Sequence, residues 1–174
     1  MPKPAKIGHL VINAKDLTAA TKFYTDVIGF EIALERPGFG TFLTAGENHH
    51  DLAIFQAPEG AADTSDGDVG LNHMAILVDD FETLTEYWHK LQGHFDSAEI
   101  RTTDHGMTKS IYIKDPEGNG IELYCNSPGR PRRGFGRDAQ PGSEKHRVGL
   151  QLTRQFYRLA IKGPLRFRGP FLLP

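Results

Sequence analysis

The order of apolar and polar positions in the first third of the chain predicts one strand, one helix and three further strands. Residues 6–14 are rich in apolar and β-branched side chains, which is typical of a strand. Asp16 is a favoured helix N-cap, Gly29 is a typical helix stop, and apolar residues recur between them at helical spacing. The strands that follow are expected near 30–36, 39–45 and 50–56.

The same pattern recurs after a shift of 64 residues. A strand over 71–78 carries His73 at the position of His9, Asp80 caps a second helix, and three strands are expected near 98–103, 109–114 and 120–125. A unit that is this long and occurs only twice is not a solenoid repeat. We therefore predict an α+β fold of paired βαβββ modules, about 6–57 and 71–126, that share a cupped, partly closed mixed sheet.

Charge divides the chain near residue 126. Residues 1–126 hold 9 Lys or Arg against 20 Asp or Glu, whereas residues 127–174 hold 11 against 2. The second part is also rich in Pro, Gly and Arg. We expect a domain over 1–126 and a basic tail over 127–174 that folds back on the acidic body or a partner subunit, or is largely mobile. Within the tail, 148–162 is the segment expected to form a short amphipathic helix or strand.

Composition excludes several classes of protein. No apolar run approaches the roughly 18 residues that a membrane helix needs, and the first residues lack the apolar stretch of a secretory signal. We expect a cytoplasmic homo-oligomer that binds neither membranes nor nucleic acid. Because Cys125 is the single cysteine, any metal would be held by nitrogen and oxygen ligands.

Three titratable residues fall in the middle of predicted strands: His9, His73 and Glu122. Taken singly, each is best explained as a hydrogen-bonded core histidine or a solvent-facing glutamate. The repeat changes this interpretation, because two equivalent histidines converge if both face the interior of a shared sheet. Two imidazoles and one carboxylate form the facial triad that holds non-haem Fe(II) and leaves coordination positions open. Where the second copy has Glu122, the first copy offers Gln56-Ala57-Pro58, so we expect no fourth ligand.

The densest run of polar side chains lies over 102–122. In chain order this run contains a small residue, a His, an apolar-Tyr pair, a polar-Pro pair, a Gly and a Glu. These positions are Thr103, His105, Ile111, Tyr112, Asp115, Pro116, Gly118 and Glu122. A second stretch, 49–55, reads His-His-Asp-Leu-Ala-Ile-Phe. Both stretches resemble signatures of the type I extradiol ring-cleavage dioxygenases of the vicinal oxygen chelate superfamily. The resemblance covers about 6–126 and describes a single-domain member.

This resemblance implies a function for each candidate residue. The two equivalent histidines and Glu122 would hold Fe(II), with Mn(II) as the other metal to consider, and the substrates would be O2 and a small aromatic diol. His50 would be the acid/base, a task that suits an imidazole with an ordinary pKa of about 6.5. His105 and Tyr112 would hydrogen-bond the substrate. The ring would open next to the two hydroxyl-bearing carbons, and no organic cofactor is implied.

Two alternatives stay open. The first is a glyoxalase-like or thiol-transferase metalloenzyme of the same superfamily that uses Ni(II), Zn(II) or Mn(II). The missing carboxylate in the first copy counts against it, as do His50, His105 and Tyr112, which a glyoxalase does not need. The second alternative is a non-enzymatic protein that sequesters an aromatic ligand or drug between the modules. The complete set of three metal ligands counts against that one.

Overall fold

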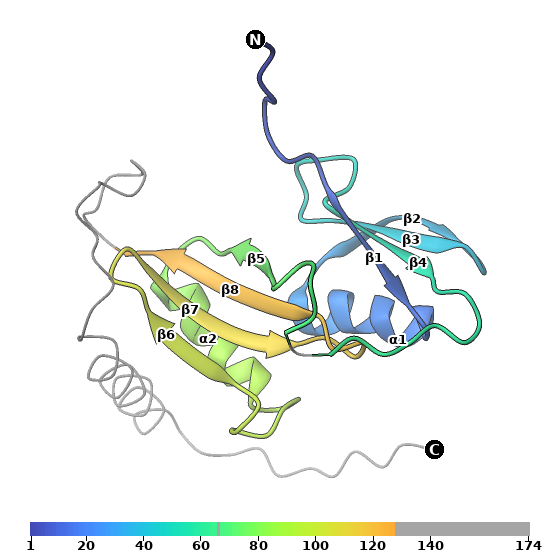
Figure 1. The fold of residues 1–174 in the computed structure, drawn as a ribbon. Coiled ribbons are helices and arrows are strands. Elements are labelled where there is room, and N and C mark those ends of the chain that lie inside the picture. The colour runs from blue at the N-terminus through green and yellow to red at the C-terminus, as the bar shows by residue number, and fades with distance from the viewer. Residues whose placement is uncertain (66, 128–174) are drawn as a thin grey trace.

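The computed structural model describes residues 1–65 and 67–127 and contains two βαβββ modules (Figure 1). Module 1 consists of β1 (Leu10–Ala14), α1 (Leu17–Lys22), η1 (Phe23–Ile28), β2 (Glu31–Arg36), β3 (Gly40–Thr44) and β4 (Leu52–Gln56). Module 2 consists of β5 (Met74–Leu77), α2 (Phe81–Leu91), β6 (Arg101–Asp104), β7 (Thr108–Lys114) and β8 (Gly120–Asn126). The predicted order of elements is therefore confirmed in both halves.

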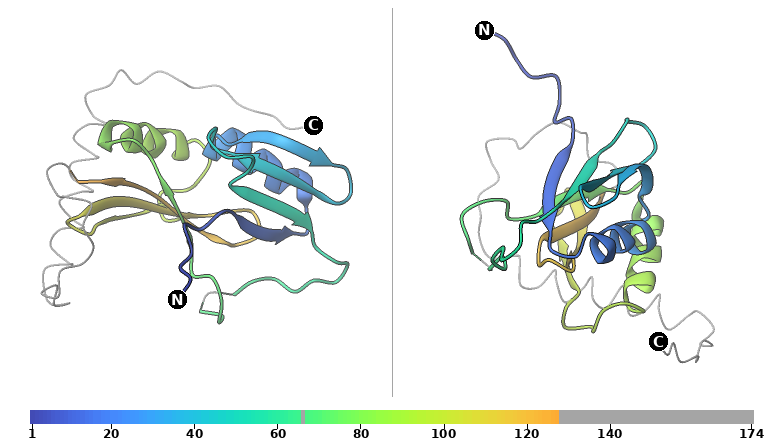
Figure 2. Two further views of the ribbon diagram at one scale, coloured as in Figure 1. Left: turned by 90° about the horizontal axis from the view of Figure 1, so that it is seen from above. Right: turned by 90° about the vertical axis from the view of Figure 1, so that its right-hand side faces the viewer.

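Each module builds its own four-stranded mixed sheet. The strand orders are β1-β4-β3-β2 and β5-β8-β7-β6, and in both the first strand runs parallel to the last strand of its module. The remaining pairs are antiparallel. The two sheets lie side by side, with α1 and α2 each packed against its own sheet (Figure 2). The predicted α+β fold of paired modules is confirmed, with the refinement that the modules form two sheets.

The helix ends follow from the capping residues that the sequence indicated. The Asp16 carboxylate accepts the N–H of Ala19 at 2.9 Å, and the Asp80 carboxylate accepts that of Thr83 at the same distance. The first helix changes from α1 into the π-helical turns of η1 and ends at Gly29, whose φ of 92° favours glycine. These caps fix where each helix begins, directly after the first strand of its module.

The modules are joined by a buried polar contact as well as by a shared apolar core. The Tyr24 hydroxyl, from η1, donates to Asp115 at 2.8 Å, and both side chains are buried. The backbone N–H groups of Lys15 and Asp16 donate to the Glu117 carboxylate. The turn between β7 and β8 is thus held against the end of β1, and this turn leads directly into the strand that carries Glu122.

Two predicted placements are wrong by a few residues. His9 and His73 do not lie in mid-strand but directly precede β1 and β5. Pairing of β1 with β4 starts at Leu10, whose N–H donates to the Asp51 carbonyl at 2.9 Å, and pairing of β5 with β8 starts at Met74. The residue of module 1 equivalent to Glu122 is Ala53, not the segment 56–58. The strand register shows this. Val11 pairs with Ala53 in module 1, and Ala75, the equivalent of Val11, pairs with Glu122 in module 2.

The expectations for the tail, including the amphipathic segment 148–162, fall on residues outside the described part, which ends at residue 127. Within the residues that are described, none of the helices has the length and apolar character needed to cross a bilayer.

Candidate active site

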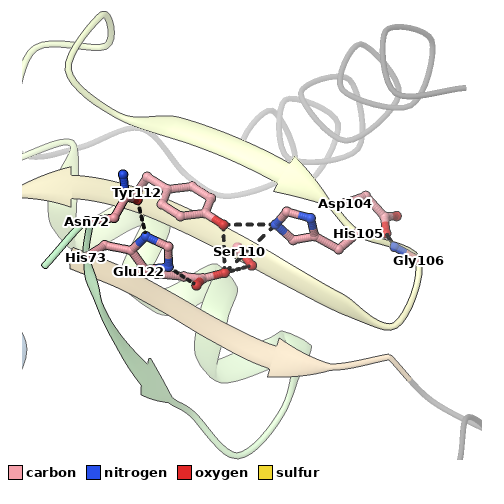
Figure 3. A network of polar contacts seen from close by, with 8 residues as sticks. All are labelled: Asn72, His73, Asp104, His105, Gly106, Ser110, Tyr112 and Glu122. Carbon is pink, nitrogen blue, oxygen red and sulfur yellow. Dashed lines mark hydrogen bonds and ion pairs between the residues drawn. The ribbon is translucent and has the colours of Figure 1, made fainter. Parts of the chain in front are cut away.

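The polar centre of module 2 is the Glu122 carboxylate on β8, which is only 9% exposed (Figure 3). Its Oε1 accepts a hydrogen bond from Ser110 Oγ at 2.5 Å and another from the Tyr112 hydroxyl at 2.8 Å. Its Oε2 lies 3.0 Å from His73 Nε2. The two hydroxyls therefore orient the carboxylate and leave the second oxygen facing an imidazole nitrogen.

The strand geometry accounts for this grouping. Ser110 and Tyr112 are two residues apart on β7, so they share a face, and Tyr112 is the direct cross-strand partner of Glu122. His73 comes from the segment before β5, beside the first residue of β8, Gly120. A Cβ on Gly120 would lie 2.7 Å from the carbonyl oxygen of Asn72 and 3.1 Å from His73 Cβ. Glycine at that position lets the histidine segment approach the carboxylate.

His105 borders the same group from the other side. Its Nε2 lies 2.9 Å from the Tyr112 hydroxyl and 3.9 Å from Glu122 Oε1. On the opposite side, His73 Nδ1 lies 2.7 Å from the side-chain oxygen of Asn72. Because an amide oxygen only accepts, this contact places a proton on Nδ1, while Nε2 faces the Glu122 carboxylate.

The surroundings of Glu122 and Tyr112 give these two groups different charge states at neutral pH. Burial alone would raise the pKa of Glu122, but hydrogen bonds from Ser110 and Tyr112 and the nearby histidines outweigh it, so this pKa lies below its ordinary value. Burial, followed by the hydrogen bond to the carboxylate and its charge, raises the pKa of Tyr112 to about 12. At neutral pH the carboxylate is ionised and the phenol keeps its proton.

Module 1 contributes a second group, centred on His50. The His50 ring lies with its centroid 4.3 Å from that of His9 and 5.3 Å from that of Phe42. His49 Nδ1 is 2.6 Å from His50 Nδ1. Burial first, and then the charges of the two neighbouring histidines, lower the pKa of His50, which keeps this imidazole neutral at neutral pH. Phe39 and Phe55 extend the aromatic wall beyond Phe42.

The structure thus places the candidate residues in two groups. Four of them gather in module 2: His73, His105, Tyr112 and Glu122. The other two, His9 and His50, lie together in module 1. His73 and Glu122 offer the nitrogen and oxygen donors that a divalent metal binds. Within residues 1–65 and 67–127, no three His, Cys, Asp or Glu side chains are arranged to hold one ion.

Sequence reasoning missed two groups that support these candidates, namely Ser110 and Asn72. For Ser110 a signal existed, because alternation along a strand places it on the same face as Tyr112. No comparable pattern indicates a role for Asn72.

Known proteins resemble this chain over most of its described part. A profile of the Glyoxalase/Bleomycin resistance protein/Dioxygenase superfamily matches residues 6–123. Biphenyl-2,3-diol 1,2-dioxygenase 3 of Rhodococcus globerulus is 36% identical over 129 residues, which are 72% of this chain and 66% of that protein. Catechol-2,3-dioxygenase of Bacillus subtilis (strain 168) is 31% identical over 134 residues, which are 77% of this chain but only 45% of that protein.

A solved structure of different stated activity is also similar. The crystal structure of lactoylglutathione lyase from Agrobacterium tumefaciens superposes with a TM-score of 0.54 and 28% identity over 71% of this chain and 96% of that one. Proteins similar to this chain therefore include two named as dioxygenases and one named as a lyase. Taken with the profile match, the paired modules and their two sheets, these similarities show that the chain belongs to the Glyoxalase/Bleomycin resistance protein/Dioxygenase superfamily.

Proposed function

We propose that this protein is an extradiol dioxygenase, which uses O2 to open the ring of a catechol-type aromatic diol next to the two hydroxyl-bearing carbons. The observation that carries the proposal is the environment of Glu122. An ionised carboxylate lies 3.0 Å from an imidazole nitrogen and is bordered by a phenol and a second imidazole. That arrangement combines metal-binding donors with groups that hydrogen-bond or transfer protons.

The proposed metal is Fe(II), with Mn(II) as the other metal to test, and the proposed ligands are His9, His73 and Glu122. When bound, the metal would supply the one-electron chemistry that allows O2 to react with a closed-shell diol. His73 and Glu122 already face each other with suitable atoms. His9 has to join them, and its exposed position directly before β1 leaves its side chain outside the apolar core.

The remaining candidates handle the substrate and its protons. His50 has a lowered pKa and is a neutral imidazole, so it can accept a proton from the diol near neutral pH. Tyr112 keeps its proton, which it donates to Glu122, so its oxygen can accept a hydrogen bond from a substrate hydroxyl. His105 Nε2, 2.9 Å from that hydroxyl, can donate a hydrogen bond to the phenol oxygen and so holds the ring in place.

Ala53 argues against the glyoxalase-like alternative. The residue that the register sets equivalent to Glu122 has no ligating side chain, so this position of module 1 offers no second carboxylate to a shared ion. A site with three protein ligands leaves room for both hydroxyls of a diol and for O2. The complementary aromatic wall of Phe42 and His50 suits a planar ring more than a flexible thiol conjugate.

The test is turnover after anaerobic loading with Fe(II). The loaded protein is mixed with catechol or 2,3-dihydroxybiphenyl and O2, and both O2 uptake and the yellow ring-fission product are recorded. Glu122→Ala is expected to lose both signals, while the matched control Glu86→Ala, on the exposed face of α2, retains them. Turnover of a hemithioacetal without O2 uptake on any catechol would contradict the proposal.

A further inference from the structure

A cavity of about 500 Å³ opens beside the candidate active site. Its wall includes His73 and Tyr112 from that site, Arg101 and Lys114 from the neighbouring strands, and the segment 67–72. Its volume falls in the range of small-molecule pockets, which is about 300–1,000 Å³. A ligand in this cavity would therefore reach the proposed metal ligand His73 and the cation of Arg101 at the same time.

Arg101 is held in a defined place. It is the first residue of β6 and the direct cross-strand partner of Tyr112. Its guanidinium carbon lies 4.4 Å from the centroid of the Tyr112 ring, which is a cation–π contact. The same phenol donates to Glu122. The Tyr112 ring therefore lies between the Arg101 cation and the Glu122 carboxylate. Arg101 and Tyr112 both line the cavity.

The charge of Arg101 is not matched by a carboxylate partner in the described part of the chain, where it forms no ion pair within 4.0 Å. Two carboxylates also line the cavity, but both bind their own loops. Glu99 accepts the N–H of Asp96 at 2.8 Å, and Asp68 accepts that of Ser65 at 2.9 Å. The cavity thus presents one guanidinium, held in place by the Tyr112 ring, beside the proposed site for aromatic diols.

We propose that the substrate is an aromatic diol that carries a carboxylate, and that Arg101 binds this carboxylate. The inference rests on the proposed function and names its substrate class. A guanidinium matches a carboxylate with two parallel hydrogen bonds, which orients a planar ring as well as binding it. With the carboxylate at Arg101, the two hydroxyls are directed along the Tyr112 ring toward His73 and Glu122.

Equilibrium binding tests this proposal independently of turnover. The Fe(II)-loaded protein is titrated without O2 with 3,4-dihydroxybenzoate and with catechol, by calorimetry, and the ratio of the two affinities is compared between variants. Arg101→Met is expected to lower this ratio about 10- to 100-fold, the usual effect of losing a charged hydrogen-bonded pair. Arg101→Lys keeps the charge without the two-pronged geometry and is expected to recover part of the ratio.

Arg36→Met is the matched control, because Arg36 is an exposed residue of β2 in the other module. Equal affinity ratios in wild type, Arg101→Met and Arg36→Met would overturn the proposal, provided that thermal melting shows Arg101→Met to be folded. If Arg101→Met does not fold, the Arg101→Lys ratio decides, and a wild-type ratio for Arg101→Lys overturns the proposal.

Selective binding without O2 uptake would refute the proposed reaction but keep the carboxylate site. Ring cleavage of catechol without selective binding of 3,4-dihydroxybenzoate would support the proposed reaction and refute the carboxylate site.

Discussion

The two modules have the same fold but opposite chemistry on equivalent positions. In module 2, Tyr112 pairs with Glu122 and Ser110 lies two residues before Tyr112 on the same face. In module 1, the equivalent pair is Phe42 and Ala53, with Gly40 two residues before Phe42. The polar set of Ser, Tyr and Glu is thus replaced by Gly, Phe and Ala. Where the carboxylate is absent, both hydroxyls that would hold it are absent as well.

The difference shows that the sheet fixes positions while the side chains decide what each face does. In module 2, the buried carboxylate is compatible with its surroundings because two hydroxyls and two imidazoles compensate for lost water. In module 1, the same place needs no compensation, and aromatic rings cover it. The two modules therefore differ at equivalent positions, with polar groups around a carboxylate in module 2 and aromatic rings in module 1.

Removing the carboxylate should have the largest effect, because it makes module 2 resemble module 1 at the central position. We expect Glu122→Ala to lose the bound metal and to retain less than ~1% of the ring-cleavage activity. Metal content by atomic emission and O2 uptake measure the two effects. Full metal content in the folded variant would refute Glu122 as a ligand.

His9 offers a sharper version of the same test, because its ring lies against His50 in module 1. We expect His9→Ala to lose metal to the same extent as Glu122→Ala. His49→Ala serves as the control, since His49 contacts His50 but is not a proposed ligand. If His9→Ala binds one equivalent of iron as tightly as wild type, the three proposed ligands do not serve one ion.

An intermediate effect is expected from the hydroxyl that supports the carboxylate. Ser110→Ala removes the 2.5 Å hydrogen bond to Glu122 Oε1 but leaves the Tyr112 bond. Groups that orient a metal ligand are worth about 10- to 100-fold in metal affinity or activity. We expect a loss in that range, measured by competition with a metal chelator. Ser97→Ala, at an exposed position of the same module outside its strands, is the control and should stay near the wild-type affinity.

Much of the fold could be predicted because its signals are local. Capping by Asp16 and Asp80 and the glycine stop at Gly29 depend on neighbouring residues, and all three were confirmed. The register between β1 and β4 depends instead on pairing between segments about forty residues apart, so Ala53 could not be identified as the equivalent of Glu122.

The site was predictable in part for the same reason. A sequence motif marked Tyr112 and Glu122, which the structure brings together. No local pattern could show that His9 lies with His50, or that the ring of Tyr112 carries the Arg101 cation, because those contacts depend on how strands pack.

The smallest expected effect concerns the hydroxyl that connects the modules. Tyr24 in module 1 donates to Asp115 in module 2, and after the shift of 64 residues its equivalent is Trp88, which has no hydroxyl. Burial first, and then the neighbouring carboxylate, raise the pKa of Tyr24 well above its ordinary value. Since the folded pKa exceeds the unfolded one of about 10, the stabilisation is complete below that pH and declines above it.

The stability difference between wild type and Tyr24→Phe should therefore depend on pH. Above about pH 10 it should fall by ~1.4 kcal/mol per pH unit, because only the unfolded wild-type chain releases the Tyr24 proton. Urea unfolding at pH 8, 9, 10 and 11 measures it, and subtracting the variant removes the titration of all other groups. Parallel stability curves over this range would show that the Tyr24 hydroxyl ionises as easily in the folded protein as in the unfolded chain. In that case the hydrogen bond to Asp115 would add nothing to the coupling of the modules that the shared apolar core and the bonds to Glu117 provide.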